Sequence, residues 1–216
     1  MKGYTKPVLV VLLVLLADQI LKFWIKLHMT LGQEFQIFGK YGIIHFTENN
    51  GMAFGMEFGG ETGKLALSLF RIIAVCGIGY GVHHLIKKKY HRGLILNVSL
   101  IFAGALGNII DSTIYGLIFS ESTYFSAAKL FPARGGYAQL FHGKVVDMFY
   151  FPLFQGTFPK SLPFWGGEEF IFFRPVFNVA DAAISVGVIL ILLFQKHYFK
   201  EETIEESYPH SEVVEE

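Results

Sequence analysis

The chain is poor in charged residues and in cysteine, and each shortage excludes a class of protein. Only 17% of its 216 residues are Asp, Glu, Lys or Arg, against about 25% in typical soluble domains. The single cysteine, Cys76, leaves no partner for an intramolecular disulfide. A formal net charge of +0 gives no basis for binding nucleic acid. These shortages point away from soluble, disulfide-stabilised and nucleic-acid-binding proteins.

The sequence also lacks the common motifs of metal-dependent and nucleophilic enzymes. It contains no His-Glu-x-x-His pair and no Cys-x-x-Cys pair, and its serines have no obvious base nearby. His28, His45 and His142 are isolated, and the other histidines fall in segments expected to be cytoplasmic. We therefore expect neither a metal nor a cofactor.

Long apolar runs are what the sequence has in excess. A membrane-spanning helix needs roughly 20 predominantly apolar residues, and four runs meet that need: 7–27, 65–86, 94–117 and 176–194. No small-residue cleavage site follows the first run, so we expect a retained span and not a cleaved signal peptide. The sequence predicts an α-helical integral membrane protein with four transmembrane helices.

Clusters of basic residues orient these spans. Lys2 and Lys6 precede the first run, "HHLIKKKYHR" joins the second to the third, and Lys196 and Lys200 follow the fourth. Short loops rich in Lys and Arg stay cytoplasmic. Both termini are therefore expected in the cytoplasm.

This orientation places two loops, 28–64 and 118–175, outside the membrane. In the first loop, "GIIHF" alternates like a strand, and the Asn49-Asn50-Gly51 sequence that follows is typical of a turn. The second loop is long and rich in Phe, Tyr, Gly and Pro, so we expect it to form a cap at the membrane interface. Residues 1–200 are expected to form one membrane domain, and the acidic tail, 201–216, to be disordered.

The first and third spans each contain a pair of polar residues on one helix face. Asp18 and Lys22 are four residues apart and share one helix face. They could be an ion pair that merely offsets its own burial, although an Asp near the centre of a span costs about 2.5–3.5 kcal/mol on insertion scales. Asn108 and Asp111 share a face of the third span in the same way.

A packing interpretation accounts for only part of the third span. Gly104 and Gly107 would let another helix approach closely, with polar residues as additional contacts. That interpretation explains the glycines well and Asp111 poorly.

In this topology Asn108 and Asp111 lie near the outer surface of the membrane. Three further polar sites lie on that same outer side: the loop motif "ENNGMAFG", "KVVDMF" with Asp147, and "FNVAD" with Asn178 and Asp181. Ionisable groups at membrane depth are functional candidates by default. Two carboxylates within hydrogen-bonding distance cannot both ionise. The ionised one can deprotonate a water molecule while the other donates to a substrate carbonyl, which is the chemistry of aspartic proteases.

Five motifs in this order resemble the lipoprotein signal peptidases (signal peptidase II): "DQILK", "NNGMAFG", "AGALGNIID", "VVDMF" and "FNVADAAI". The resemblance implies that Asp147 and Asp181 form a catalytic dyad. It also implies a four-helix bundle with an extracytoplasmic β-rich cradle, in a bacterial inner membrane with the active site near the outer leaflet. The supporting and substrate-binding residues that it implies are Asp18, Lys22, Asn49, Gly51, Asn108, Asp111 and Asn178.

The activity implied by the resemblance is that of a membrane-embedded endopeptidase. Such an enzyme removes the signal peptide of a diacylglyceryl-modified prolipoprotein on the N-terminal side of the lipidated cysteine. The expected partners are these prolipoproteins and membrane lipid, with no nucleic acid, and we expect the protein to be a monomer.

The sequence departs from the family pattern in two respects. Ser112 stands where the family has an arginine, and Arg71 or Arg174 could take over its part. The spacing between the motifs is stretched, which predicts inserted cap structure near 118–143 and 152–173.

Two other functions are compatible with some of these features. A small transport or proton-relay protein could use Asp18, Asp111 and Asp181, but transporters usually have more spans and repeated halves. A membrane assembly factor could bind a partner through the aromatic cap, but this leaves the carboxylates unexplained. We favour the peptidase.

Overall fold

A computed structural model describes residues 3–50, 60–172 and 174–199 of the chain. Its long helices are α1 (Thr5–His28), α2 (Gly60–Lys87), α3 (Arg92–Ile110) and α5 (Val179–Tyr198). Within the described residues, 4 helices are long and apolar enough to cross a membrane, which agrees with the expected fold class. Gly51 and the acidic tail, 201–216, lie outside the described residues.

The third and fourth of these helices depart from a regular α-helix at the ends that lie near the sheet. The third continues beyond α3 through a π-helical turn, η2 (Asp111–Tyr115), and a final short turn, α4 (Gly116–Ile118). The fourth begins at Val179 and not at Val176, because the preceding residues form a strand, β6 (Val176–Phe177), that pairs with the sheet. The polar start of the fourth run is therefore a strand-to-helix junction.

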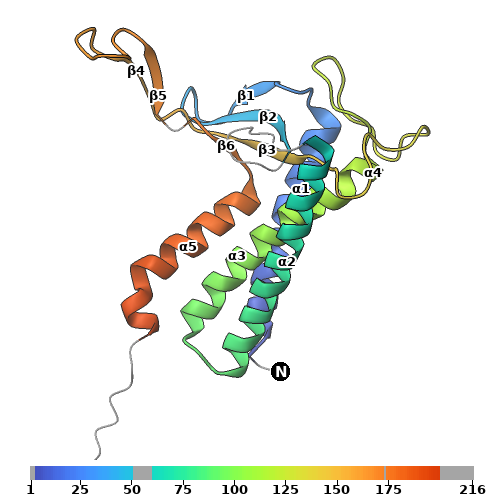
Figure 1. Cartoon of the computed structure of the whole chain (residues 1–216), viewed down its shortest axis with the longest axis vertical. Helices are drawn as coiled ribbons and strands as arrows, with labels where there is room; N and C mark the ends of the chain where they lie inside the picture. The colour runs from blue at the N-terminus through green and yellow to red at the C-terminus, as the bar shows by residue number, and fades with distance from the viewer. Residues whose placement is uncertain (1–2, 51–59, 173, 200–216) are drawn as a thin grey trace, which may run out of the picture.

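A small antiparallel sheet lies across one end of the helices (Figure 1). Its strands are β1 (Glu34–Gln36), β2 (Ile43–Asn49), β3 (Val145–Tyr150) and β6, in the order β1-β2-β3-β6. The strand predicted at "GIIHF" falls in β2. This sheet corresponds to the expected cradle.

Apolar side chains join the sheet to the helices. Phe46 of β2 and Met148 of β3 are fully buried, and they pack in one cluster with Ile25 of α1 and Tyr115 of η2. Burying large apolar side chains stabilises such a contact by roughly 1.5–3 kcal/mol each. The core therefore fixes β3, which carries Asp147, over the ends of α1 and α3.

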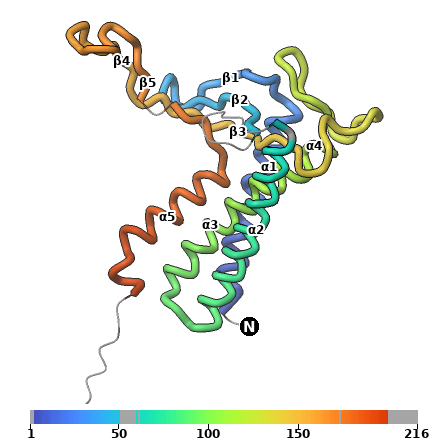
Figure 2. Tube along the Cα trace, in the orientation of Figure 1, coloured from blue at the N-terminus to red at the C-terminus, as the bar shows by residue number. Residues whose placement is uncertain are grey.

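The two stretched regions of the sequence differ in structure. The first, between α4 and β3, consists mostly of turns and contains one isolated bridge, Phe119 to Leu130. The second contains a hairpin of β4 (Phe154–Thr157) and β5 (Glu169–Phe172), which projects away from the helices (Figure 2). Phe154 and Phe172 face each other across this hairpin and are 67% and 56% exposed.

A glycine seam sets the position of α5. A Cβ atom on Gly104 would collide with the carbonyl oxygen of Ala180, and a Cβ atom on Gly187 would lie 2.7 Å from the carbonyl oxygen of Asn97. The predicted role of Gly104 is thus correct, and the helix that it admits is α5. This close packing brings the first turn of α5 beside the end of α3, where Asn108 lies.

Candidate active site

Asp147 lies in the middle of β3 with only 3% of its surface exposed. Two amides hold its carboxylate: Asn178 Nδ2 donates to Oδ1 at 2.7 Å, and Asn49 Nδ2 donates to Oδ2 at 3.3 Å. β3 is buried on both faces here, since Val146 and Met148 are fully enclosed on one face and Val145, which shares the face of Asp147, is 4% exposed. The carboxylate therefore has a fixed position in an enclosed setting.

Asp181 lies in the first turn of α5, where it completes the cap of that helix. The Asn178 side chain accepts from the Asp181 backbone N–H at 2.9 Å, and Asp181 Oδ2 accepts from the Asn178 N–H at 3.3 Å. This reciprocal pair is a capping box. Asn108 Nδ2 also donates to Asp181 Oδ1 at 2.8 Å. Asn178 thus holds both aspartates, because the same side chain bonds Asp147 and caps Asp181.

The electrostatics of the pair follow from this enclosure. Burial is the main cause that raises the pKa of Asp147 to about 7, and the negative charge of Asp181 adds to it. The hydrogen bonds from Asn49 and Asn178 act in the opposite direction. Near neutral pH, Asp147 is therefore poised to exchange a proton.

An ion cluster lies beneath the two aspartates. Lys22 Nζ lies 2.8 Å from Asp18 Oδ2 and 2.8 Å from Asp111 Oδ2, and it donates to Asn108 Oδ1 at 3.0 Å. All three ionic side chains are completely buried. Lys22 therefore joins α1 to the end of α3. The interpretation of Asp18 and Lys22 as an ion pair that only offsets its own burial is incomplete, because Lys22 also binds Asp111 and Asn108.

The two acids of this cluster also bond the backbone beside the dyad. Asp18 Oδ1 accepts from the N–H of Ala180 at 2.9 Å, and Asp111 Oδ2 accepts from the N–H of Val146 at 3.2 Å. Ala180 and Val146 directly precede Asp181 and Asp147. One buried lysine thus holds two carboxylates, each of which fixes the peptide next to one dyad residue.

Comparison with known proteins identifies the family of this chain. The family model for signal peptidase (SPase) II matches residues 10–196. The chain belongs to the signal peptidase II family.

Sequence identity to lipoprotein signal peptidases of other bacteria supports this assignment. The lipoprotein signal peptidase of Porphyromonas gingivalis is 53% identical over 193 residues, which cover 89% of this chain and 83% of the relative. That of Amoebophilus asiaticus is 36% identical over 187 residues, covering 85% of this chain and 75% of the relative. The predicted family resemblance is confirmed.

Solved structures agree on the fold. Two structures described as bacterial membrane enzymes superpose with TM-scores of 0.56 and 0.55, at 25% and 24% identity. They cover 90% and 91% of this chain and 93% and 92% of theirs. This signal peptidase II homologue is accordingly a multi-pass protein of the bacterial inner membrane.

Two residues of this family member were missed by sequence reasoning. Gln19 donates to Asp18 Oδ2 at 3.1 Å and to Asp111 Oδ1 at 3.0 Å, and it accepts from Tyr115 at 3.1 Å. Lys26 is fully buried and pairs with Glu48, next to Asn49, at 2.5 Å. The spacing of Asp18, Lys22 and Lys26, four residues apart on one helix face, was a signal that could have indicated Lys26.

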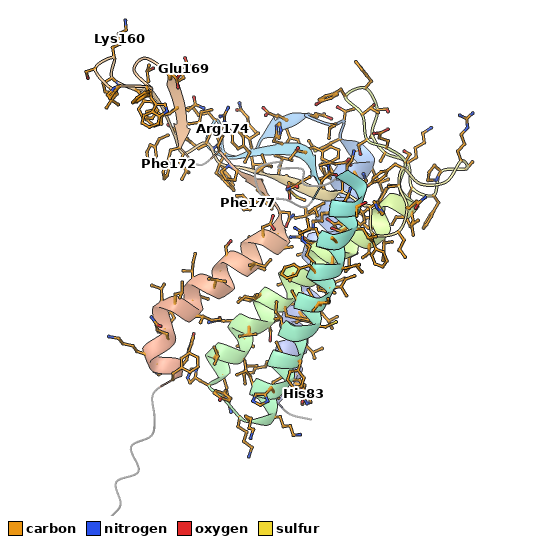
Figure 3. The ribbon with its side chains drawn as sticks, in the orientation of Figure 1. His83, Lys160, Glu169, Phe172, Arg174 and Phe177 are labelled. Atoms are coloured by element: carbon orange, nitrogen blue, oxygen red, sulfur yellow. The ribbon has the colours of Figure 1, made fainter. Side chains whose placement is uncertain are left out.

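Ser112, which stands where the family has an arginine, is buried at the start of η2. The Ser112 hydroxyl donates to the Asn108 carbonyl at 3.0 Å and so bonds its own helix. Of the two arginines considered as substitutes, Arg71 of α2 interacts electrostatically with Asp181. Arg174 is exposed and lies between the hairpin and the sheet (Figure 3). Arg71 is therefore the stronger candidate for a cation acting on the dyad.

Among the described residues, no group of three or more His, Cys, Asp or Glu side chains is placed to hold a metal ion. The two carboxylates at the site, Asp147 and Asp181, are instead held by the carboxamides of Asn49, Asn108 and Asn178.

Proposed function

We propose that this protein is an aspartyl endopeptidase that removes the signal peptide from diacylglyceryl-modified prolipoproteins. It cleaves on the N-terminal side of the lipidated cysteine, using water activated between Asp147 and Asp181. The observation that carries the proposal is the Asn178 side chain, which bonds the carboxylate of Asp147 while it caps the first turn of α5 at Asp181. Membership of the signal peptidase II family supports the class of substrate.

The dyad divides the acid and base roles between its members. Asp147 carries the shared proton, because burial and the charge of Asp181 raise its pKa to about 7. Asp181, ionised and hydrogen-bonded by Asn108, takes a proton from the attacking water. Asp147 donates its proton to the carbonyl oxygen of the scissile peptide. In the collapse of the tetrahedral intermediate, the C–N bond breaks as the proton held by Asp181 passes to the leaving amine. Asp147 takes back a proton from a hydroxyl group of the intermediate, which becomes the new carboxyl group, and the dyad regains its starting protonation.

The surrounding residues position this pair. Asp18 and Asp111 fix the peptides beside the two aspartates, and Lys22 neutralises their charge. Asn49 supports Asp147 from β2. Gly51 belongs to the proposed substrate-binding set through the family motif alone.

The location of the site suits a lipid-anchored substrate. The dyad lies where the start of α5 meets the sheet, at the end of the helical bundle. The basic residues of the α2–α3 turn lie at the other end, so we place that end and both termini in the cytoplasm and the dyad near the outer leaflet. A diacylglyceryl group held in that leaflet would bring the scissile peptide to this depth.

The proton-relay alternative has less support. Asp18 and Asp111 are tied to Lys22 and to backbone N–H groups, so they are committed to fixed bonds. A relay needs carboxylates that pass protons from one to the next, whereas the carboxylates of Asp18 and Asp111 accept hydrogen bonds from Lys22 and from backbone N–H groups.

The test is cleavage of a diacylglyceryl prolipoprotein by purified variants. Asp147→Asn and Asp181→Asn should each lower kcat by about 10²–10⁴-fold, the contribution typical of a general acid or base. The matched control is Glu169→Gln, which removes an exposed carboxylate from the hairpin and should leave the rate unchanged. Processing by either Asn variant at close to the wild-type rate would show that the dyad is wrongly assigned.

A further inference from the structure

A second candidate site lies at the end of the bundle opposite the dyad. A cavity of about 730 Å³ opens between the start of α1, the turn that joins α2 to α3, and the first residues of α3. Tyr4 of this region bonds His83 at 2.9 Å, which ties the start of α1 to the end of α2. The cavity therefore belongs to the packed bundle, and the peptidase mechanism makes no use of it.

The lining of this cavity divides into a cationic and an apolar part. Lys6, Lys89 and Arg92 contribute positive charge from three different segments. None of the three forms an ion pair with any residue that the structure describes. Pro7 and Ile95 are buried and supply part of the apolar wall. No acidic residue of the described chain lines the cavity, so its charge is uncompensated.

The backbone at Lys89 gives a second, independent observation. Lys89 has a φ of 57°, in the left-handed region. Its N–H bonds Ile86 O at 3.1 Å, and the N–H of Tyr90 bonds Leu85 O at 3.0 Å, a pattern that normally carries glycine at this position. A lysine here is strained by its Cβ atom. Strain retained at the mouth of a cavity indicates that the side chain has a use.

We propose that this cavity binds the headgroup phosphate of an anionic phospholipid. The three cations surround the phosphate, and the start of α3 adds the positive end of its helix dipole. The acyl chains lie against the apolar wall formed by residues such as Pro7 and Ile95 and continue along the helices. Basic pockets between membrane-spanning helices suit such headgroups.

The apolar wall favours a lipid over a soluble anion. Inorganic phosphate would use the cations alone and leave the apolar half of the lining unused. Ile86 and Leu96 also contribute to that half, so the cavity presents both chemistries of a phospholipid. The proposal is independent of the peptidase mechanism, because it concerns the opposite end of the bundle.

Binding to the full-length protein can be measured by native mass spectrometry from a neutral detergent. Phosphatidylglycerol should bind more tightly than phosphatidylcholine, and inorganic phosphate at the same concentration should not displace it. Arg92→Gln and Lys89→Gly should each weaken phosphatidylglycerol binding by about fivefold, the value of one cation near a lipid surface. The matched control is Lys88→Gln, which removes an adjacent exposed cation that does not line the cavity.

Lys89→Gly separates binding from folding. Glycine relieves the strained backbone, so the melting temperature of this variant without lipid should equal or exceed that of the wild type. An equal loss of binding in Lys88→Gln would reveal diffuse surface charge and overturn the proposal. Displacement by inorganic phosphate would indicate a soluble anion. Binding that appears only after removal of 201–216 would show that the acidic tail occupies the cavity.

Discussion

Asp147 is costly to the folded protein in its charged form, because its carboxylate is enclosed beside a second acid. A pKa raised from 3.8 to about 7 corresponds to on the order of 4 kcal/mol between the protonation states. The amides of Asn49 and Asn178 recover part of that cost by donating to the carboxylate. A cost of this kind for the charged form is expected at a site where one carboxyl group must hold a proton near neutral pH.

Asp147→Asn should therefore stabilise the protein above pH 7, although it lowers kcat by about 10²–10⁴-fold. A carboxyl group with a raised folded-state pKa contributes stability below its unfolded pKa, near 4, and loses it as the pH rises to about 7. The melting temperature of Asp147→Asn should exceed that of the wild type at pH 8, and the difference should vanish near pH 4. A variant that is less stable than the wild type at pH 8 would contradict the raised pKa.

Asn178 combines two roles that one substitution can separate. Asn178→Asp retains an oxygen to cap α5, since Asp is as good a cap as Asn. It removes the amide that donates to Asp147 and adds a negative charge nearby.

The expected result is a lower kcat and a higher apparent pKa for the group whose protonated form is active. The pH dependence of kcat measures both effects, and circular dichroism of the variant checks that the helix is retained. A profile identical to that of the wild type would exclude the bond from Asn178 to Asp147 as a determinant of the dyad.

At the scale of elements, the seam between α3 and α5 decides whether the dyad forms at all. Gly104 and Gly187 let the two backbones approach, and the first turn of α5 then reaches Asn108. The hairpin of β4 and β5, in contrast, pairs within itself and projects from the bundle. The sequence predicted inserted structure in both stretched regions, but it did not distinguish a hairpin from a region of turns.

Gly104→Ala should disrupt this seam, because the added Cβ atom meets the carbonyl oxygen of Ala180. We expect a loss of about 1–3 kcal/mol of stability and a lower kcat, since α5 must shift with Asp181. Gly77→Ala is the matched control: a Cβ atom there meets nothing within 4 Å, so the change should be neutral or slightly stabilising. Thermal unfolding in detergent and the cleavage assay measure both effects. If Gly104→Ala and Gly77→Ala had the same stability and the same kcat, the glycine seam would not determine the position of α5.

At the scale of the whole molecule, polar chemistry is segregated between the two ends of the bundle. The dyad, its amides and the sheet lie at one end, and the cationic cavity with the α2–α3 turn lies at the other. The uneven distribution of Lys and Arg predicts which end is cytoplasmic.

This orientation can be checked by cysteine labelling, since the only native cysteine, Cys76, is easily removed. In a Cys76→Ala background, Phe131→Cys should react with a membrane-impermeant maleimide in intact spheroplasts. Ser211→Cys, in the C-terminal tail, should react only after permeabilisation. The reverse pattern would place the dyad on the cytoplasmic side.

The sequence by itself determined the membrane spans and the residues that share a helix face. Apolar runs of sufficient length have no stable alternative to a helix in lipid, and helical spacing put Asp18 beside Lys22 and Asn108 beside Asp111. These properties depend on neighbours along the chain. The order of the five motifs along the chain also indicated the family to which the protein belongs.

Only the tertiary structure decided which polar groups meet across the molecule. The bond from Asp18 to the Ala180 N–H joins residues 162 positions apart, and Asn178 reaches Asp147 from a different element. Such partners depend on how closely α3 and α5 pack and on where the sheet lies over the bundle. The sequence named the two aspartates through their motifs, but the close packing of helices from distant parts of the chain determined what holds them.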